Sequence, residues 1–445
     1  MSVADPAAAP APVRPLVAAQ GLIRRKAAVA IAAPLLVLAY LVHVALAFDL
    51  AHLPDRARPD NGLILLQDFW SYKVQVTRDN RTGRVTSSIE GMRNATFGDA
   101  NRPGWIAEDA QGTHVALPEG HAVDIAPDGL VVLTTPAARH EIRPTATGVE
   151  TAIPDPPPGF SVSDSRFSAV LPGGSRLSVT RARTEVTRRQ PGWELFLFDL
   201  DSPFQGRSLA ELARLAVGGP RLDPARPNIA AMAHDFWTNG IWHHRDTAWA
   251  LFETILMAFL GTFGAGLVAL PLAFLAAANF APLGLVRQGA RRLFDLLRGV
   301  DALIWTIVLS RAFGPGPLTG ALAILLTETG TFGKLFSEAL ENIDERPVDG
   351  LRATGAGPLG RIRWAVLPQV APVIASQLLY YFESNTRSAT VVGAITGGGM
   401  GLLLMQAMQT QKDWEHVAWY IVLIVVMVML MDRLSGRIRA RLIRG

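Results

Sequence analysis

Long apolar runs alternate with polar stretches along this chain, and the longest polar stretch lies between the first and second runs. The first run covers residues 27–48, which are 22 residues without an acid, a lysine or an arginine. The later runs lie at 248–278, 301–313, 317–336, 370–382 and 417–431. A helix that crosses a bilayer needs about 20 mostly apolar residues. The pattern therefore predicts an all-α polytopic membrane protein with about six transmembrane helices.

The first run has two interpretations. The tripeptide Ala-Leu-Ala at 45–47 is typical of a signal-peptidase site. The apolar stretch is longer than the core of a typical signal peptide, so we favour an uncleaved anchor. Residues 1–26 then form an N-terminal tail and 27–48 the first transmembrane helix.

Basic residues predict the orientation of these spans. They precede the first span, lie between the second and third, follow the fourth and trail the sixth, and a six-span chain places all four segments on one side. Short basic segments stay in the cytoplasm. The basic residues of the four segments are, in chain order, Arg14, Arg24, Arg25, Lys26; Arg287, Arg291, Arg292, Arg298; Arg346, Arg352, Arg361, Arg363; Arg433, Arg437, Arg439, Arg441 and Arg444. We therefore expect both termini in the cytoplasm, with 433–445 as a basic tail.

The polar stretch at 49–247 is expected outside the membrane as a small, mainly β domain. Alternating apolar and polar residues predict strands on both sides of the turn at 80–83, within 174–187 and at 193–201, and a short helix at 208–217. The chain has no cysteine, which excludes disulfides and thiolate metal sites. His234, His243, His244 and Asp246 allow a metal site in principle. Because adjacent histidines on a regular element point in different directions, we favour interfacial histidines and expect no metal.

The loop at 337–368 carries a spaced pattern of small residues. Asp349, Gly350 and Leu351 are followed after three residues by Gly355, and nine further residues lead to Ala365-Val366-Leu367-Pro368. This spacing resembles the cytoplasmic signature of binding-protein-dependent ABC importer permeases, which is Glu-Ala-Ala, three residues, Gly, nine residues and Ile-x-Leu-Pro. The chain departs from it by Asp for Glu, Gly-Leu for Ala-Ala and Ala for Ile.

Over residues 249–432 the chain further resembles the phosphonate permease subunit of ABC importers. The resemblance implies a type I ABC importer permease fold over 248–432, with a coupling helix within Val348–Gly357. It also implies contact with cytoplasmic ATPase subunits, an extracytoplasmic phosphonate-binding protein and a second permease copy in a bacterial inner membrane, and no nucleic acid. The residues expected to couple to the ATPase are Asp349, Gly350, Leu351, Ala353, Gly355, Ala356, Leu367 and Pro368. The chain lacks a G-x-x-x-x-G-K-[ST] motif, so we expect a non-catalytic subunit without a cofactor, whose partner ATPase binds ATP and magnesium.

The fifth run continues into a polar stretch at 383–390. Glu383 and Arg387 lie four residues apart and therefore share a helix face on which they can pair. One hypothesis is that Arg387 grips a passing phosphonate, with Glu383 orienting it; the other is that the two form a structural ion pair. Ser384, Asn385 and Thr390 can add hydrogen bonds to the substrate path. The acid Glu328 would repel an anion unless it is protonated or paired.

Glycines follow this polar stretch. Gly393, Gly397, Gly398, Gly399 and Gly401 predict either close helix packing or a backbone break, and three consecutive glycines favour the break. Together these features predict the membrane subunit of an ATP-driven phosphonate importer. The alternatives are a permease for another oxyanion, such as phosphate or phosphite, and a membrane-anchored sensor or adaptor that works through the external domain.

Overall fold

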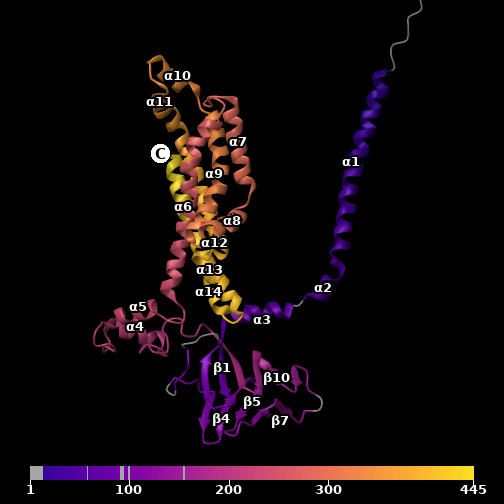
Figure 1. The fold of residues 1–445 in the computed structure, drawn as a ribbon, viewed down its shortest axis with the longest axis vertical. Coiled ribbons are helices and arrows are strands. Elements are labelled where there is room, and N and C mark those ends of the chain that lie inside the picture. The colour runs from indigo at the N-terminus through magenta and orange to yellow at the C-terminus, as the bar shows by residue number, and fades with distance from the viewer. Residues whose placement is uncertain (1–13, 58, 91–94, 99–100, 154–155, 445) are drawn as a thin grey trace, which may run out of the picture. The chain divides into compact units, whose positions relative to one another are not determined.

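The computed structural model describes residues 14–57, 59–90, 95–98, 101–153 and 156–444 (Figure 1). Residues 1–13 of the expected N-terminal tail lie outside this description. The chain divides into two units, one ending at Leu65 and the other beginning at Leu66. In the first unit, α1 (Arg14–Ala47) is followed by η1 (Leu50–His52), α2 (Leu53–Arg56) and most of α3 (Pro59–Phe69). The helix α1 starts well before the apolar run, and its part from Arg25 to Ala47 is long and apolar enough to cross a membrane.

In the second unit, residues 71–191 form two antiparallel sheets of six strands each. The strand orders are β2-β1-β12-β11-β10-β9 and β3-β4-β5-β6-β7-β8. The strands are β1 (Ser71–Asp79), β2 (Val85–Ile89), β3 (Ile106–Asp109), β4 (Gly112–Ala116), β5 (Ala122–Ile125), β6 (Val131–Thr134), β7 (Arg139–Pro144), β8 (Val149–Thr151), β9 (Phe160–Ser163), β10 (Arg166–Leu171), β11 (Ser175–Thr180) and β12 (Arg183–Pro191). Short 3-10 turns, η2 (Pro118–Gly120) and η3 (Pro172–Gly174), join strands.

Both sheets contribute to one apolar core. Val76 of β1 and Leu177 of β11 are fully buried in the same cluster as Val123 of β5 and Leu133 of β6. Strands such as β1, β4, β5 and β6 alternate buried and more exposed residues, as expected for a sheet with one face on the core and the other in solvent. The strands expected around residues 80–83 and within 174–187 are therefore confirmed.

The strand expected at 193–201 is wrong, because this segment is irregular. Leu195 has a left-handed backbone with φ of 55°. The apolar side chains that suggested a strand instead fill an aromatic cluster, in which the ring of Trp193 lies 5.6 Å from Trp242 and that of Phe196 4.9 Å from Trp419. Burial of these rings stabilises the segment more than a regular strand would. The helix expected at 208–217 is α4 (Leu209–Gly218), capped by Ser208, and α5 (Asn228–Trp237) follows.

The remaining helices form a bundle in which α6 packs along α9 and α12 (Figure 1). The bounds are α6 (His244–Ala276), α7 (Gly284–Gly299), α8 (Ala302–Phe313), α9 (Pro317–Glu341), α10 (Glu345–Ala353), α11 (Pro358–Arg361), the π-helical turn η4 (Ile362–Val366), α12 (Leu367–Thr396), α13 (Gly399–Thr410) and α14 (Trp414–Arg444). Sequence reasoning treated the arginine-rich segment 284–299 as a connection and did not predict α7. It also did not predict α13 as a separate helix.

Glycines let these helices approach closely, as is usual inside membranes. A Cβ on Gly261 of α6 would lie 2.7 Å from Ile324 of α9, and one on Gly333 of α9 would lie 2.2 Å from the ring of Phe294 in α7. Phe294 is almost fully buried. The amphipathic helix α7 is thus packed onto α9 by one large ring over a glycine.

Four helices in the described residues are long and apolar enough to cross a membrane, namely those over 25–47, 244–276, 358–396 and 414–442. The expected third and fourth spans are present as α8 and α9. The helix α8 has only 12 residues, and α9, with 25, is interrupted by Glu328 and Lys334. Six crossings therefore remain a prediction.

Candidate translocation path and coupling loop

The coupling loop is built around the short helix α10. Asp344 caps its start by accepting a hydrogen bond from the backbone of Arg346 at 3.0 Å. At its end, the backbone N–H of Gly355 donates to the carbonyl of Arg352 at 3.1 Å and that of Ala356 to the carbonyl of Leu351 at 3.2 Å. These two bonds form a Schellman motif, which requires a residue with a left-handed backbone just past the end of the helix. Gly355 has φ of 84°, so glycine at this signature position has a structural reason.

The expected coupling residues share this surface. Asp349, Gly350, Ala353 and Gly355 are exposed on α10 and its terminal turn, whereas Leu351 and Ala356 are half-buried. A cavity of about 330 Å³ lies beside them, lined partly by Phe280, Val348 and Asp349. Leu359 and Trp364, 82% and 68% exposed, add apolar surface that sequence reasoning missed. Exposed apolar residues next to a groove are typical of a protein-binding surface.

Gln369 fastens α10 to the start of α12. Its side-chain oxygen accepts from the backbone N–H of Asp344 at 2.9 Å, and its nitrogen donates to the carbonyls of Asp344 at 3.2 Å and Ala365 at 2.8 Å. Leu367 and Pro368 form the first turn of α12, where the missing N–H of proline costs little. One amide side chain thus joins the N-cap residue of α10 to the turn that precedes α12.

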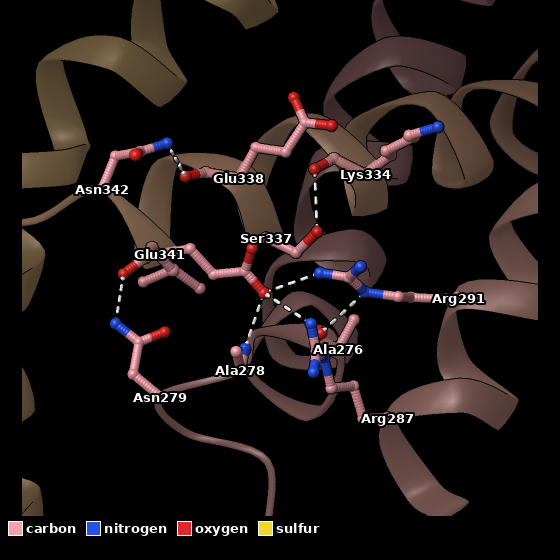
Figure 2. Close-up of polar contacts among 11 residues, drawn as sticks. Ala276, Ala278, Asn279, Arg287, Arg291, Lys334, Ser337, Glu338, Glu341 and Asn342 are labelled. Atoms are coloured by element: carbon pink, nitrogen blue, oxygen red, sulfur yellow. Dashed lines mark hydrogen bonds and ion pairs between the residues drawn. The ribbon is translucent and has the colours of Figure 1, made fainter. Parts of the chain in front are cut away.

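A carboxylate at the end of α9 connects this helix to α7 and to the end of α6 (Figure 2). Glu341 accepts hydrogen bonds from the backbone of Ala278 at 2.7 Å and from Arg291 at 2.6 Å, and its oxygen lies 3.7 Å from Arg287. Arg291 also donates to the carbonyl of Ala276 at 3.2 Å, which belongs to the last turn of α6. The two arginines of α7 therefore neutralise Glu341 and satisfy a helix-terminal carbonyl at once.

The polar stretch of α12 differs from the expected pairing. Glu383 pairs with Arg439 of α14 at 3.3 Å, not with Arg387. Arg387 is exposed and has no polar partner among the described residues. The reason is geometric: α14 packs along α12, so Arg439 reaches Glu383 across the interface, where burial strengthens the pair.

The other path residues lie on different faces of α12. Asn385 is buried and donates to the hydroxyl of Thr262 in α6 at 2.9 Å. Glu328 is buried in α9, and its Oε2 has no hydrogen-bond partner among the described groups. Ser384 is half-buried, and Thr390 is buried with a hydroxyl that has no partner among the described groups. Asn385 thus turns towards the bundle core, whereas Arg387 turns away from it.

The glycines that follow separate two helices. The helix α12 ends at Thr396, Gly397 has a left-handed φ of 77°, Gly398 is extended, and α13 begins at Gly399. A Cβ on Gly401 would lie 1.9 Å from the carbonyl oxygen of Thr390. The glycines therefore permit both the reversal and the close contact of the two helices.

Side chains of α6 cap the new helix. Glu253 accepts from the backbone N–H of Gly399 at 3.1 Å, and the hydroxyl of Thr254 accepts from that of Met400 at 2.9 Å. A carboxylate at a helix N-terminus is favourable. Sequence reasoning missed both residues, although an acid within the apolar run at 248–278 was a visible signal.

The histidines near the start of α6 have separate partners. His243 lies 3.6 Å from Asp246, while His244 hydrogen-bonds the carbonyl of Phe196 at 2.7 Å and stacks on Phe236. No group of three potential metal ligands is present in the described part of the chain. His244 therefore belongs to the aromatic cluster, whereas His243 pairs with Asp246.

Comparisons with known proteins identify the family of this chain. Residues 269–444 match the family described as "Binding-protein-dependent transport system inner membrane component". The chain is 39% identical over 213 residues to the phosphite transport system permease protein PtxC of Stutzerimonas stutzeri, covering 48% of this chain and 77% of that protein. It is 48% identical over 122 residues to the putative cryptic phosphonate transport system permease protein PhnE2 of Escherichia coli, covering 27% of this chain and 99% of that protein.

A third relative is the phosphate-import permease protein PhnE of Mycolicibacterium smegmatis, 31% identical over 217 residues, which are 49% of this chain and 38% of that protein. A solved inward-facing structure of the MetNI methionine ABC transporter is 18% identical with a TM-score of 0.40, over 44% of this chain and 95% of that one. The assignment therefore rests on the sequence relatives. The chain belongs to the binding-protein-dependent permeases of ABC importers, in the group of phosphonate and phosphite permeases.

Proposed function

We propose that this chain is the transmembrane permease subunit of an ATP-driven phosphonate importer, which forms the translocation path and couples it to a separate ATPase. The observation that carries this proposal is the coupling loop, in which the family's spacing coincides with a capped helix, a glycine that closes it and an exposed groove. The relatives' names, which include phosphite, phosphonate and phosphate, support an oxyanion of phosphorus as the substrate.

The proposed mechanism is alternating access. The coupling helix within Val348–Gly357 sits in a groove of the cytoplasmic ATPase, with Leu359 and Trp364 as apolar anchors. When ATP closes the ATPase pair, the two coupling helices of a permease dimer approach each other and the path opens outward. Hydrolysis resets it inward. Because Gln369 joins α10 to α12, displacement of the loop moves the helix that carries the polar stretch.

Within the path, we assign substrate contact to Arg387. Its guanidinium is exposed and free of polar partners among the described residues, so it can form a bidentate pair with an oxyanion without first breaking an ion pair. Glu383 and Arg439 brace α12 against α14. Asn385 and Thr262 brace it against α6, beside Glu328. Ser384 and Thr390 can add hydroxyl contacts, and Gly397–Gly401 form the break at the outer end of the path.

The proposal includes the surroundings of the chain. It places the protein in a bacterial inner membrane with both termini in the cytoplasm, in a homodimer served by an extracytoplasmic binding protein. The insert at 49–247 then lies outside the membrane. A permease for phosphite or phosphate is the second candidate, because a single arginine accepts any of these anions and the relatives' names include both.

The coupling assignment is tested in cells whose only phosphonate permease is this one, growing on a phosphonate as sole phosphorus source. Gly355→Val places a branched side chain at a left-handed position, so ATPase association and growth should both be lost. Gly289→Ala in α7, where a Cβ would meet nothing within 4 Å, is the control and should grow normally. Normal growth of the Gly355→Val strain would refute the coupling role.

The path assignment is tested with Arg387→Gln in purified transporter. Uptake of phosphonate should fall while ATPase association and thermal stability stay at wild-type values. Loss of folding would instead assign Arg387 a structural role. Deleting residues 55–235 tests the sensor alternative, which predicts normal transport and abolished signalling.

A further inference from the structure

The solvent-facing side of the first sheet carries a polar pocket that the transport assignment does not use. It has a volume of about 270 Å³ and is lined from β1, β10, β11 and β12, with Glu90 and Lys412 at its rim. Three exposed arginines, Arg166, Arg176 and Arg183, line it together with the half-buried carboxylate of Glu185. Threonine and serine hydroxyls from the same strands complete the lining.

The strand register brings these side chains together. Arg176 lies opposite Thr187, and Ser178 lies opposite Glu185 in the β11–β12 pair. Their neighbours Leu177 and Val186 point to the other face, into the core. Because side chains alternate along a strand, every second residue of three adjacent strands shares one face. The pocket is therefore a consequence of the alternation that also builds the core.

The charges in the pocket are not balanced. Lys412 and Glu90 pair with each other at 3.4 Å and cancel. The guanidinium groups of the three arginines form no ion pair with any described carboxylate, including Glu185. Three positive charges thus face one unpaired negative charge within a single concave site. An excess of guanidinium groups in a concave polar site is the arrangement that proteins use to bind oxyanions.

We propose that this pocket binds a compact tetrahedral oxyanion of phosphorus outside the membrane. The choice of a phosphorus oxyanion over other anions rests on the proposed function. The carboxylate of Glu185 in the pocket supports the same choice. Near neutral pH a phosphorus oxyanion can keep one P–OH proton, because its second pKa lies close to neutrality. Arg176 and Arg183 then donate to the ionised oxygens, and Glu185 accepts the hydrogen bond of the P–OH group.

This arrangement excludes a fully ionised anion of the same shape. Sulfate has no proton at neutral pH, so its oxygens would meet the half-buried carboxylate of Glu185 without a hydrogen bond between them, and two unpaired anionic acceptors repel each other. The pocket also includes a residue from the helical bundle. Lys412 at its rim belongs to the connection between α13 and α14, directly after the helix that follows the glycine break. The pocket is thus linked along the chain to the glycine break through α13.

The test uses the full chain in lipid nanodiscs and titration calorimetry with inorganic phosphate, methylphosphonate and sulfate. All variants carry Arg387→Gln as well, which removes binding in the membrane path. Arg176→Gln and Arg183→Gln should each weaken phosphate and methylphosphonate binding by roughly three- to tenfold, the loss expected for one charge-assisted contact that is partly exposed. Arg139→Gln, an exposed arginine of β7 outside the pocket, is the matched control and should leave both affinities unchanged.

Glu185→Gln gives the second, independent readout. Removing the carboxylate should strengthen sulfate binding several-fold and so reduce the preference for phosphate over sulfate, because an amide can donate to an anion as a carboxylate cannot. Unchanged phosphate affinity in both arginine variants, or an unchanged phosphate-to-sulfate preference in Glu185→Gln, would overturn the proposal. So would arginine variants that lose only the docking of a purified extracytoplasmic binding protein, since the surface would then recognise a protein.

Failure of this site and failure of the proposed function are separable. If the chain supports no phosphonate uptake but the pocket still binds phosphate, the transport function fails and the site stands. If uptake is normal and the pocket variants bind phosphate as the wild type does, the site fails and the transport function stands.

Discussion

The contact between α12 and α13 makes a quantitative prediction for Gly401→Ala. A Cβ on Gly401 would lie 1.9 Å from the carbonyl oxygen of Thr390 and 2.4 Å from the backbone nitrogen of Ala394, whereas ordinary contact begins at 3.4 Å. Both neighbours are backbone atoms, so no side-chain rotation can relieve the overlap. Two helices must separate by about 1.5 Å, which exceeds the shifts that usually accompany overpacking at a cost of about 1–3 kcal/mol.

A gain in helix propensity of about 1 kcal/mol opposes this cost, because alanine is a better helix former than glycine. We therefore expect a net loss of roughly 3 kcal/mol or more in the free energy of unfolding. For a helical bundle of about 200 residues, a loss of about 3 kcal/mol corresponds to a fall in Tm of roughly 6–12 °C. The assay is thermal unfolding of the full chain in detergent, followed by intrinsic tryptophan fluorescence.

The matched control is Gly436→Ala in α14, where an added Cβ would meet nothing within 4 Å. That variant feels only the propensity gain, so its Tm should stay level or rise. A Gly401→Ala protein as stable as the Gly436→Ala protein would refute the reasoning. It would show that α12 and α13 can part without cost, and that the glycines do not hold the break in place.

Two further predictions concern charged groups. Burial raises the pKa of Glu194, while its hydrogen bond with the Tyr72 hydroxyl lowers it. The net shift is upward, so the pKa of Glu194 is higher in the folded protein than in the unfolded chain, and wild-type stability falls as the pH rises through the folded-state pKa. Glu194→Gln should therefore raise Tm relative to the wild type by more at pH 8 than at pH 4. An equal difference at both pH values would contradict this. A double-mutant cycle on Glu383→Gln and Arg439→Gln should show a coupling of about 1 kcal/mol in the free energy of unfolding. The effects of Glu383→Gln and Arg387→Gln on that free energy should be additive. The reverse result would show that Glu383 pairs with Arg387.

Features of the chain that depend on backbone conformation could be predicted from the sequence. Gly355 at the end of a short helix and three consecutive glycines at 397–399 each indicate a backbone that other residues adopt poorly. The sheet hairpins were predictable for a similar reason, since alternation and turn residues act over a few positions. These signals are local, so a single sequence contains them.

Contacts between distant segments could not be predicted. Arg439 is 56 residues from Glu383, and Glu253 is 146 residues from the Gly399 that it caps. Local spacing suggested Arg387 as the partner of Glu383, but an interhelical neighbour competes with any residue one turn away. The strand prediction for 193–201 was wrong for the same reason. Apolar and polar residues do alternate there, but the ring of Trp193 packs against Trp242 and Trp419, which lie elsewhere in the chain.

The anchoring of α6 connects the coupling loop to the break. Its last turn is held to α9 through Glu341 and Arg291, close to where the loop begins, and its Glu253 and Thr254 hold the first turn of α13. Gln369 meanwhile ties the loop to α12. A displacement of α10 therefore acts on α12 directly, while α6 holds the far side of the glycine break. The left-handed Gly397 therefore separates the helix that is tied to the loop from the helix that α6 holds, and a substitution there acts on both.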